Sequence, residues 1–301
     1  MEINLLITGG LGHIGSYLIN NLPEIYNVTV VDNMFTNKYN SLFKLSKNIK
    51  FINCDFSEVS VDVLKSTDIV LHLAAITDAT NPNNYEDIET TNVSLTKLFI
   101  DKCIEHSCAR FIFPSSTSVY GVAADYVTEN DDSFLNPQSP YAESKIEIEK
   151  YLQESTIDYV ILRLGTIFGV SPGMRFHTAI NKFCYQAALG EPLTVWKQNY
   201  HQYRPYLGLS DCKNGLLQVI RHKSKRETYN LITNNYRLDY IVNLIKSIKD
   251  VEVDMVKTPL LNQHSYKVDM TKIQTLGFYP RSNIHKEITR TMNLFKRINN
   301  D

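Results

Sequence analysis

Tyr141 and Lys145 stand four residues apart in the segment PYAESK, residues 140–145, and together they could carry out proton transfer. Residues at this spacing share one face of a helix, and a proline suits the first helical turn. A nearby ammonium group stabilises phenolate and lowers the pKa of a tyrosine from its usual value of about 10. A tyrosine with a lowered pKa is useful in general acid–base catalysis. The same spacing also occurs on ordinary solvated helix faces, which is the alternative.

Hydroxyl side chains fill the segment SSTSVYG, residues 115–121, directly after a run that is expected to be a strand. In open α/β sheets, ligands bind at the carboxyl ends of the strands. A hydroxyl group there could hold a substrate oxygen as its proton leaves. The alternative is a polar turn in which serine and threonine cap backbone groups.

The segment TGGLGHIG, residues 8–15, follows an expected strand and opens an expected helix, which is the context of a dinucleotide-binding loop. Gly9 can turn sharply with a positive φ, Gly12 lets the backbone approach a pyrophosphate, and Gly15 lets the helix pack closely on the strand. The pyrophosphate would meet N–H groups at the helix N-terminus. For this motif alone, a structural turn without a ligand is the alternative.

Asp32 ends the second expected strand, about 20 residues after the glycines. A carboxylate at this position would accept hydrogen bonds from the adenosine ribose and repel a 2′-phosphate. The sequence therefore favours NAD over NADP. An aspartate that only caps a helix is the alternative.

The elements that must position these residues begin with short, nearly continuous apolar runs, which are typical of strands buried in a parallel sheet. The expected strands are Ile3–Thr8, Asn27–Asp32, Lys50–Cys54, Asp68–Ala74, Arg110–Pro114 and Tyr159–Leu164. The helices expected between them are His13–Leu22, Asn83–Glu105 and Tyr141–Gln153. This alternation predicts an α/β protein with a doubly wound parallel sheet, the Rossmann fold.

The pattern changes after about residue 165, where Pro and Gly interrupt it more often. We expect a smaller C-terminal α/β lobe that binds the substrate. Its expected elements are the helices Thr178–Leu189, Leu238–Ile248 and Asn283–Phe295 and the strand Leu193–Trp196. The NAD-binding domain is expected over residues 1–165 with a return segment near 208–234, and the substrate-binding lobe over residues 166–301.

Composition excludes several classes of function. The chain has 301 residues and a formal net charge of −1, without the basic surplus of strong nucleic-acid binders. Its five cysteines are scattered, which predicts reduced thiols and no zinc site. Neither a signal peptide nor an apolar run long enough for a membrane helix is evident. We therefore expect a cytoplasmic protein with no metal, no nucleic-acid partner and no membrane contact.

Together these segments resemble the extended short-chain dehydrogenase/reductase family, in its NAD-dependent nucleotide-sugar epimerase and dehydratase branch. The resemblance runs from about residue 4 to about residue 280. Its motifs are TGGLGHIG at 8–15, Asp32, Cys54-Asp55, HLAA at 72–75, Asn92, Ser116 before VYG at 119–121, Pro140-Tyr141 with Lys145, and YRPY at 203–206.

The resemblance implies a set of residues that bind NAD. Asp55 would contact the adenine amino group, and Asn92 would support the lysine site. The full implied set is Gly9, Gly12, His13, Ile14, Gly15, Asp32, Asn33, Asp55, Phe56, Leu73, Ala74, Ala75, Asn92, Tyr141 and Lys145.

The resemblance also implies catalytic and substrate-binding residues. Ser116 matches the catalytic Ser/Thr, Tyr141 the base, and Lys145 the lysine that binds the nicotinamide ribose and tunes the tyrosine. Arg204 matches an arginine that grips the diphosphate of a sugar nucleotide, with Arg175 as a second candidate. Thr117 is expected to contact the substrate as well.

Residues Thr117 and Ser118 depart from two patterns within this branch. Dehydratases usually carry Asp-Glu after the catalytic Thr, and decarboxylases carry Glu before the Val-Tyr-Gly. Small residues there are typical of epimerases, so the resemblance implies epimerisation at C4 of a nucleotide-diphosphate sugar through a transient 4-keto sugar. The alternatives are a nucleotide-sugar 4-dehydrogenase or dehydratase, and a non-catalytic NAD-binding sensor. Relatives pair through two long helices, which implies a homodimer.

Overall fold

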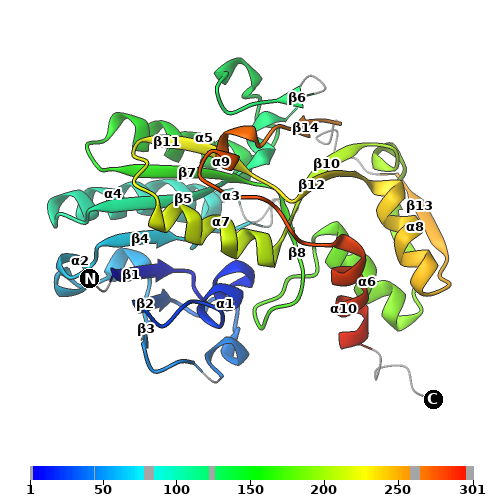
Figure 1. Ribbon diagram of the computed structural model, residues 1–301, viewed down its shortest axis with the longest axis horizontal. Coiled ribbons are helices and arrows are strands. Elements are labelled where there is room, and N and C mark those ends of the chain that lie inside the picture. Colours follow the sequence, from blue (N-terminus) through cyan, green and yellow to red (C-terminus); the bar gives the residue numbers. More distant parts are fainter. Residues whose placement is uncertain (1–2, 44, 78–84, 122–125, 258–264, 296–301) are drawn as a thin grey trace.

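Seven parallel strands form the central sheet, in the order β11-β7-β5-β4-β1-β2-β3 (Figure 1). The computed structural model describes residues 3–43, 45–77, 85–121, 126–257 and 265–295. The strands are β1 Ile3–Thr8, β2 Tyr26–Asp32, β3 Ile49–Asn53, β4 Ile69–His72, β5 Arg110–Ser116, β7 Tyr159–Leu164 and β11 Glu227–Leu231. This arrangement confirms the predicted doubly wound sheet.

Alternate side chains of the strands pack into two separate cores, because successive residues of a strand point to opposite faces. Leu5 and Ile7 face a core that includes residues of α1 (His13–Ile19) and α7 (Leu209–Arg221). Leu6 faces the other core, which includes residues of α4 (Thr96–Glu105) and α5 (Pro140–Glu154). Helices therefore cover both faces of the sheet and hold the carboxyl ends of its strands in fixed positions.

The helix expected over Asn83–Glu105 is one helical stretch from Tyr85 onward, but its middle is a π-helix. It comprises α3 (Tyr85–Ile88), the π-helix η4 (Glu89–Leu95) and α4. The Thr96 hydroxyl donates to the Thr91 carbonyl (3.0 Å), a contact across the widened turn. Wide turns of this kind are frequent at functional sites. Residues Asn83 and Asn84 of the prediction lie outside the described residues.

The second half of the chain builds a smaller α/β lobe, seen on the right in Figure 1. Its strands are β8 Thr166–Phe168, β10 Tyr203–Gly208 and β12 Asn234–Arg237 in one sheet, and the pair β9 Leu193–Trp196 and β13 Val253–Val256. A further pair, β6 Tyr126–Val127 and β14 Lys267–Val268, joins distant segments. Its helices are α6 Ala179–Leu189, α8 Leu238–Ile248 and α10 Ile284–Leu294, whereas the short helix α9 Thr271–Gln274 packs against β11 of the large sheet.

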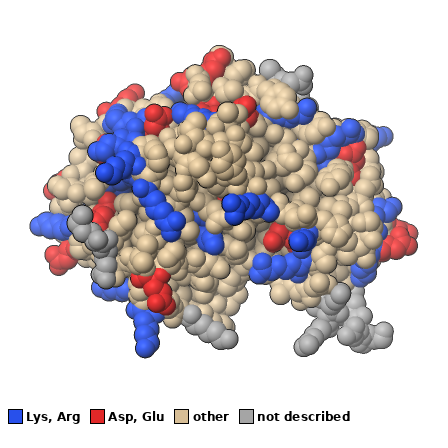
Figure 2. Space-filling model, in the orientation of Figure 1, with Lys and Arg blue, Asp and Glu red and all other residues tan. Residues whose placement is uncertain are grey.

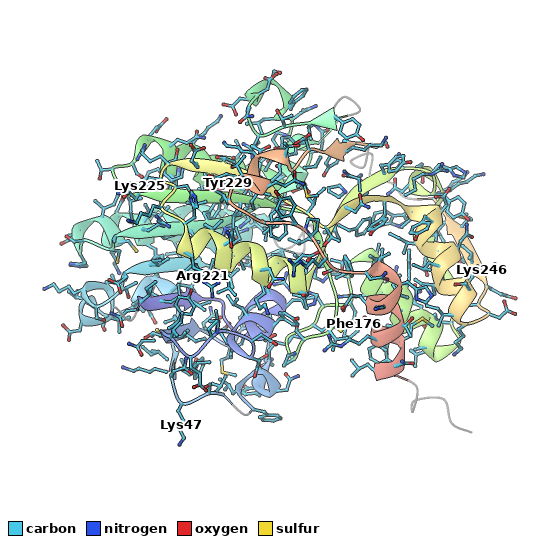
Figure 3. The ribbon with its side chains drawn as sticks, in the orientation of Figure 1. Lys47, Phe176, Arg221, Lys225, Tyr229 and Lys246 are labelled. Atoms are coloured by element: carbon cyan, nitrogen blue, oxygen red, sulfur yellow. The ribbon has the colours of Figure 1, made fainter. Side chains whose placement is uncertain are left out.

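The chain crosses back to the large sheet after the smaller lobe has begun. Strand β11 pairs with β7, and Ile273, Leu276 and Phe278 join the core beneath α7. Figure 3 shows Arg221 and Tyr229 over the large sheet and Lys246 at the outer end of the smaller lobe. Segments far apart in sequence therefore tie the two parts together.

Acidic and basic side chains are interspersed over the face shown in Figure 2, without a single-sign surface. This distribution agrees with the net charge of −1. Among the residues described by the structure, no helix is long and apolar enough to cross a membrane. Within the same residues, no cluster of three or more His, Cys, Asp or Glu side chains could hold a metal ion.

Candidate active site

A cavity of about 510 Å³ lies where the carboxyl ends of the large sheet meet the smaller lobe. It collects predicted site residues from both halves of the chain. The predicted residues that line it are Gly9, Gly12, His13, Ile14, Gly15, Leu73, Ala75, Ser116, Thr117, Tyr141, Lys145, Arg175 and Arg204. The predicted residues that do not line it are Asp32, Asn33, Asp55, Phe56, Ala74 and Asn92.

Three glycines of the segment that joins β1 to α1 and opens that helix have different surroundings in the structure. Gly9 has a φ of +64°, and a Cβ there would lie 2.5 Å from the Ala74 nitrogen. A Cβ on Gly15 would lie 2.6 Å from the Gly10 backbone. A Cβ on Gly12 would meet nothing nearer than the Gly9 carbonyl oxygen at 3.3 Å. Gly9 and Gly15 are therefore required by the fold, whereas Gly12 leaves room that opens into the cavity.

Asp32 supports this loop at the end of β2. Its carboxylate accepts hydrogen bonds from the backbone N–H groups of Leu11 (3.0 Å) and Met34 (2.8 Å). These hydrogen bonds give Asp32 a structural role in fixing the glycine loop, and this role alone can account for an aspartate at the end of β2 without a bound ligand. The ribose contact expected of Asp32 stays a prediction.

Asp55 and Asn33 lie beside each other beyond the ends of β3 and β2. The Asn33 amide donates to Asp55 (3.0 Å), and the Asp55 carboxylate caps the 3₁₀ helix η2 (Phe56–Glu58) by accepting from the Ser57 N–H (2.9 Å). The Phe56 ring is buried and packs edge-on against His72, with centroids 4.8 Å apart. The adenine contact expected of Asp55 stays a prediction.

Ser116, Tyr141 and Lys145 reach the cavity from two elements. Ser116 ends β5, and its hydroxyl accepts from the N–H (3.1 Å) and hydroxyl (2.8 Å) of Ser118. Helix α5 has Pro140 in its first turn, as the sequence predicted, and Ser139 as its N-cap. Lys145 Nζ donates to the Pro114 carbonyl (3.0 Å) and lies 5.6 Å from the Tyr141 ring centroid.

Burial raises the pKa of the Tyr141 phenol above its ordinary value, against the opposing effects of the Arg175 charge and a hydrogen bond with Ser116. The net lowering of this pKa that the sequence predicted is therefore not found in this structure, and the effect of the Lys145 charge on the phenol stays a prediction. Burial also lowers the pKa of Lys145 to about 7, so its ammonium is itself destabilised. The physical reason is the same for both groups, since a dry site disfavours every charge.

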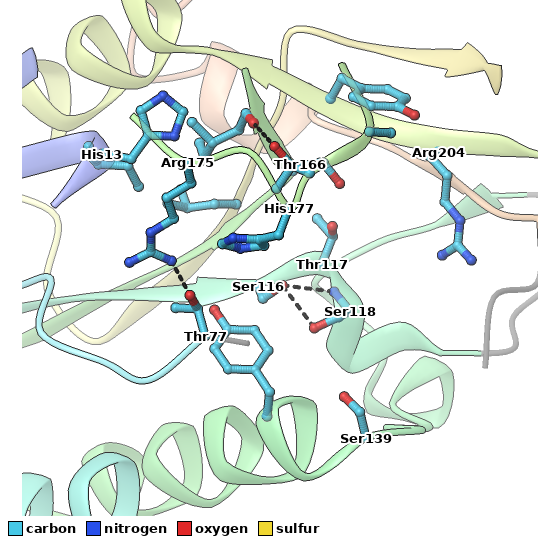
Figure 4. Close-up of a pocket in the computed structure, with 18 of the residues that line it drawn as sticks. His13, Thr77, Ser116, Thr117, Ser118, Ser139, Thr166, Arg175, His177 and Arg204 are labelled. Carbon is cyan, nitrogen blue, oxygen red and sulfur yellow. Dashed lines mark hydrogen bonds between the residues drawn. The ribbon is translucent and has the colours of Figure 1, made fainter. Parts of the chain in front are cut away.

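Arg175 and Arg204 lie on opposite sides of the cavity, with His177 and Thr117 between them (Figure 4). The Arg175 guanidinium donates to the Thr77 hydroxyl, and its Nη2 would lie 3.9 Å from a Cβ on Gly12. Arg204 Nη2 is buried and has no hydrogen-bond partner among the described residues, and the guanidinium lies 5.2 Å from the centroid of the Tyr266 ring. Because a buried unpaired donor is costly, Arg204 is placed to bind an anionic ligand.

A model of the NAD dependent epimerase/dehydratase family matches residues 5–231. The chain belongs to this family. Its membership confirms the family and the cofactor, NAD, that the sequence predicted. The chain is also 31% identical over 236 residues to an uncharacterized UDP-glucose epimerase, YtcB, of Bacillus subtilis, covering 72% of each protein. It is 24% identical to a putative UDP-glucose 4-epimerase of Methanocaldococcus jannaschii, covering 98% of this chain and 99% of that one.

The fold of this family member is similar to that of solved epimerases. A UDP-glucuronic acid 4-epimerase from Bacillus cereus, in complex with UDP-glucuronic acid and NAD, superimposes with a TM-score of 0.89 at 24% identity, covering 98% of this chain and 100% of that chain. A UDP-glucose 4-epimerase from Thermotoga maritima gives 0.86 at 23% identity, covering 98% and 99%. Both comparisons confirm the predicted fold class.

Asn92 does not line the cavity, but its side chain holds the loop after β4 in place through hydrogen bonds. Its side-chain amide accepts from the Ile76 N–H and donates to the Ile76 carbonyl, both at 2.8 Å, and donates to Ser144 (3.4 Å). It thereby links the loop after β4 to the residue before Lys145. The Ala74 N–H donates to the Thr8 hydroxyl (3.3 Å), which ties the same loop to β1.

Sequence reasoning missed several residues of the cavity wall. Thr77 could have been found, because it follows the expected strand end by a few residues. Others come from the smaller lobe, where apart from the segment YRPY no local motif marks them. They include His177, Lys182, Trp196, Asn199 and Tyr206. None of the described residues lining the cavity is Asp or Glu, so its charged lining is cationic.

Proposed function

We propose that this protein is an NAD-dependent nucleotide-sugar epimerase that acts at C4 through a transient 4-keto sugar. The observation that carries the proposal is the convergence of Ser116, Tyr141 and Lys145 on one cavity with the glycine loop and two arginines. Relatives named as UDP-glucose epimerases support the nucleotide-sugar class.

The glycine loop fits a dinucleotide, since Gly12 leaves space open toward the cavity where a side chain would stand. Bound there, NAD supplies a hydride acceptor that returns the hydride at the end of the cycle. Lys145 and Tyr141 would hold its nicotinamide ribose, and Gly9, Gly12 and the N-terminus of α1 its pyrophosphate.

Tyr141 is the proposed base, and Ser116 the proposed group that holds the C4 oxygen. Removal of the C4 hydroxyl proton by the phenolate yields the keto sugar when hydride leaves the same carbon. Arg204 would hold the nucleotide, and the nucleotide would keep the keto sugar in the cavity while the sugar rotates. Binding energy from the nucleotide thereby restrains the reacting sugar. Return of the hydride to the opposite face and of the proton to O4 gives the epimer.

The lining of the cavity favours this reaction over loss of water. Thr117 and Ser118 follow Ser116, and the described lining residues include no carboxyl group that could protonate a leaving hydroxyl. Dehydration would require such an acid. Arg175, His177 and Lys182 instead make the cavity a site for anionic ligands.

A panel of nucleotide sugars tests the proposed function. The purified protein is incubated with each compound, and the products are resolved as C4 epimers, keto sugars or released NADH. We expect a C4 epimer without net NADH. Tyr141→Phe should bind NAD and lose turnover by about 10²-fold or more. Accumulating NADH would instead identify a dehydrogenase, and near-normal turnover of Tyr141→Phe would remove the phenol from the mechanism.

We further propose that residues 1–165 and 208–234 form the NAD-binding domain and residues 166–301 the substrate-binding lobe. The remaining proposals are a cytoplasmic location and a homodimer formed through α3–α4 and α5. Support for the dimer comes from Tyr85 and Leu98 on these helices, each 57% exposed. Sedimentation of the wild type and of Leu98→Lys tests it: a dimer for the first and a monomer for the second are expected.

A further inference from the structure

Glu149 is a buried acid on α5, one helical turn after Lys145, with only 2% of its surface exposed. Residues four apart in a helix stand on the same face, with Cβ atoms about 5–6 Å apart. Glu149 therefore lies on the side of α5 that carries Lys145 toward the sheet. It does not line the cavity, so it is outside the proposed catalytic set.

The Glu149 carboxylate is held by two neighbouring strands. Arg163 on β7 donates to it from Nε (3.1 Å) and Nη2 (2.6 Å), and both side chains are almost fully buried. The hydroxyl of Ser115, on β5 beside Ser116, also donates to it. These charge-assisted hydrogen bonds fix the Glu149 carboxylate in one position beneath the helix face that carries Lys145.

Lys145 is surrounded by charges of both signs. The titratable and charged side chains on the elements packed around it are Tyr141 and Glu149 of α5, His72 of β4, Arg163 of β7 and Arg175 of the segment after β8. Burial lowers the pKa of His72 to about 3, so that imidazole is neutral. Burial likewise lowers the pKa of Lys145 to about 7, with Arg175 adding to the effect and Glu149 opposing it. Glu149 is the carboxylic acid among these side chains.

We propose that Glu149 is a positioning residue of the active site, whose buried charge keeps the Lys145 ammonium protonated at the pH of catalysis. The inference rests on the proposed function, in which Lys145 binds the nicotinamide ribose beside Tyr141. If the Lys145 amine were neutral, it would lose the positive charge that assists phenolate formation at Tyr141. Arg163 and Ser115 serve this role indirectly, because they fix the carboxylate.

The ionisation of Lys145 can be measured without any turnover. Acetic anhydride modifies neutral amines, and peptide mass spectrometry reports the modified fraction of Lys145 as a function of pH. In Glu149→Gln, the midpoint should fall by about one pH unit or more relative to the wild type. Glu147→Gln is the matched control, because Glu147 lies on the same helix but is exposed and pairs with Lys97. Its midpoint should equal that of the wild type.

The same change should appear in the reaction. The alkaline limb of kcat/KM should move to lower pH in Glu149→Gln, whereas a purely structural role would lower the rate equally at every pH. Glu149→Asp retains the charge and should restore most of the profile. Because Glu149→Gln leaves Arg163 unpaired and could fail to fold, the double variant Glu149→Gln/Arg163→Met provides a charge-balanced substitute. Its midpoint should also lie below that of the wild type.

An unchanged Lys145 midpoint in the folded single or double variant would overturn the proposal, as would an equal shift in Glu147→Gln. Failure of the proposed function is separable from this result. It would appear as a wild-type protein that converts no nucleotide sugar, whatever the labelling shows.

Discussion

The Arg175 guanidinium donates a hydrogen bond to the Thr77 hydroxyl, joining the segment that enters the smaller lobe to the loop after β4. The same guanidinium lies beside Gly12 and acts on the pKa of Tyr141. One cation therefore faces the dinucleotide loop and the proposed base. The diphosphate contact that the sequence suggested for Arg175 stays a prediction, and the position beside Tyr141 leads to another.

Arg175→Gln should shift the acid limb of kcat/KM to higher pH. Arg175 lowers the pKa of Tyr141, so its removal favours the protonated phenol and leaves less base at any given pH. A loss of about tenfold at neutral pH corresponds to one pH unit. The measurement is a pH–rate profile, with Arg204→Gln as the control that should keep the limb in place. Identical limbs in the wild type and Arg175→Gln would contradict the prediction.

Arg204→Gln should weaken nucleotide-sugar binding by about 10–100-fold and leave NAD binding unchanged. Arg204 Nη2 has no hydrogen-bond partner within the described part of the chain, and hydrogen bonds to charged groups contribute about 1.5–3 kcal/mol. Trp196 lines the cavity and is the one tryptophan of the chain, so its fluorescence can report the titration. Arg237→Gln is the control, since Arg237 pairs with Asp239 on the surface. Unaltered affinity in Arg204→Gln would exclude it from the diphosphate site.

Alanine substitution at two glycines of the same motif should affect different properties, NAD binding at Gly12 and stability at Gly15. Gly12→Ala should change the free energy of unfolding by about 1 kcal/mol or less, because its Cβ would press only on the Gly9 carbonyl oxygen at 3.3 Å, but should weaken NAD binding at least tenfold. Gly15→Ala should destabilise the fold by about 1–3 kcal/mol, because its Cβ would overlap the Gly10 backbone. Urea unfolding and NAD titration distinguish the two. Equal loss of stability in both variants would refute the separate roles.

The first half of the site could be predicted because each functional residue adjoins a regular element. Ser116 and Asp32 end buried strands with continuous apolar runs, and Tyr141 follows a proline that opens a helix. These signals are local, so spacing alone locates them. The π-helical turn around Asn92 was not predicted, since it arises from contacts with Ile76 that sequence periodicity does not contain.

The electrostatics of the site could not be predicted in the same way. Spacing placed Lys145 near Tyr141 but gave no measure of burial, which dominates both pKa values. The opposing charge of Arg175 comes from a loop without a motif. Similarly, Trp196 and Asn199 line the cavity only because the smaller lobe folds against the large sheet.

Stability should fall as the pH is lowered from 7 to 5. Burial lowers the pKa of His13 to about 4 and that of His72 to about 3, so both imidazoles are neutral in the folded protein at pH 5. The unfolded chain binds a proton at each below about 6.5, which favours unfolding by about 4 kcal/mol in total at pH 5. Urea unfolding at both pH values checks this. His72→Gln should remove about half of the difference, and an undiminished difference would exclude His72 as its source.

The fate of the C4 hydrogen tests the central proposal most directly. A substrate nucleotide sugar labelled with deuterium at C4 is converted in ordinary water, and the product is analysed by NMR and mass spectrometry. Because the hydride leaves C4 and returns to the same carbon, the epimer should keep its deuterium at C4. Exchange of that deuterium for solvent hydrogen, or conversion without inversion at C4, would contradict the account.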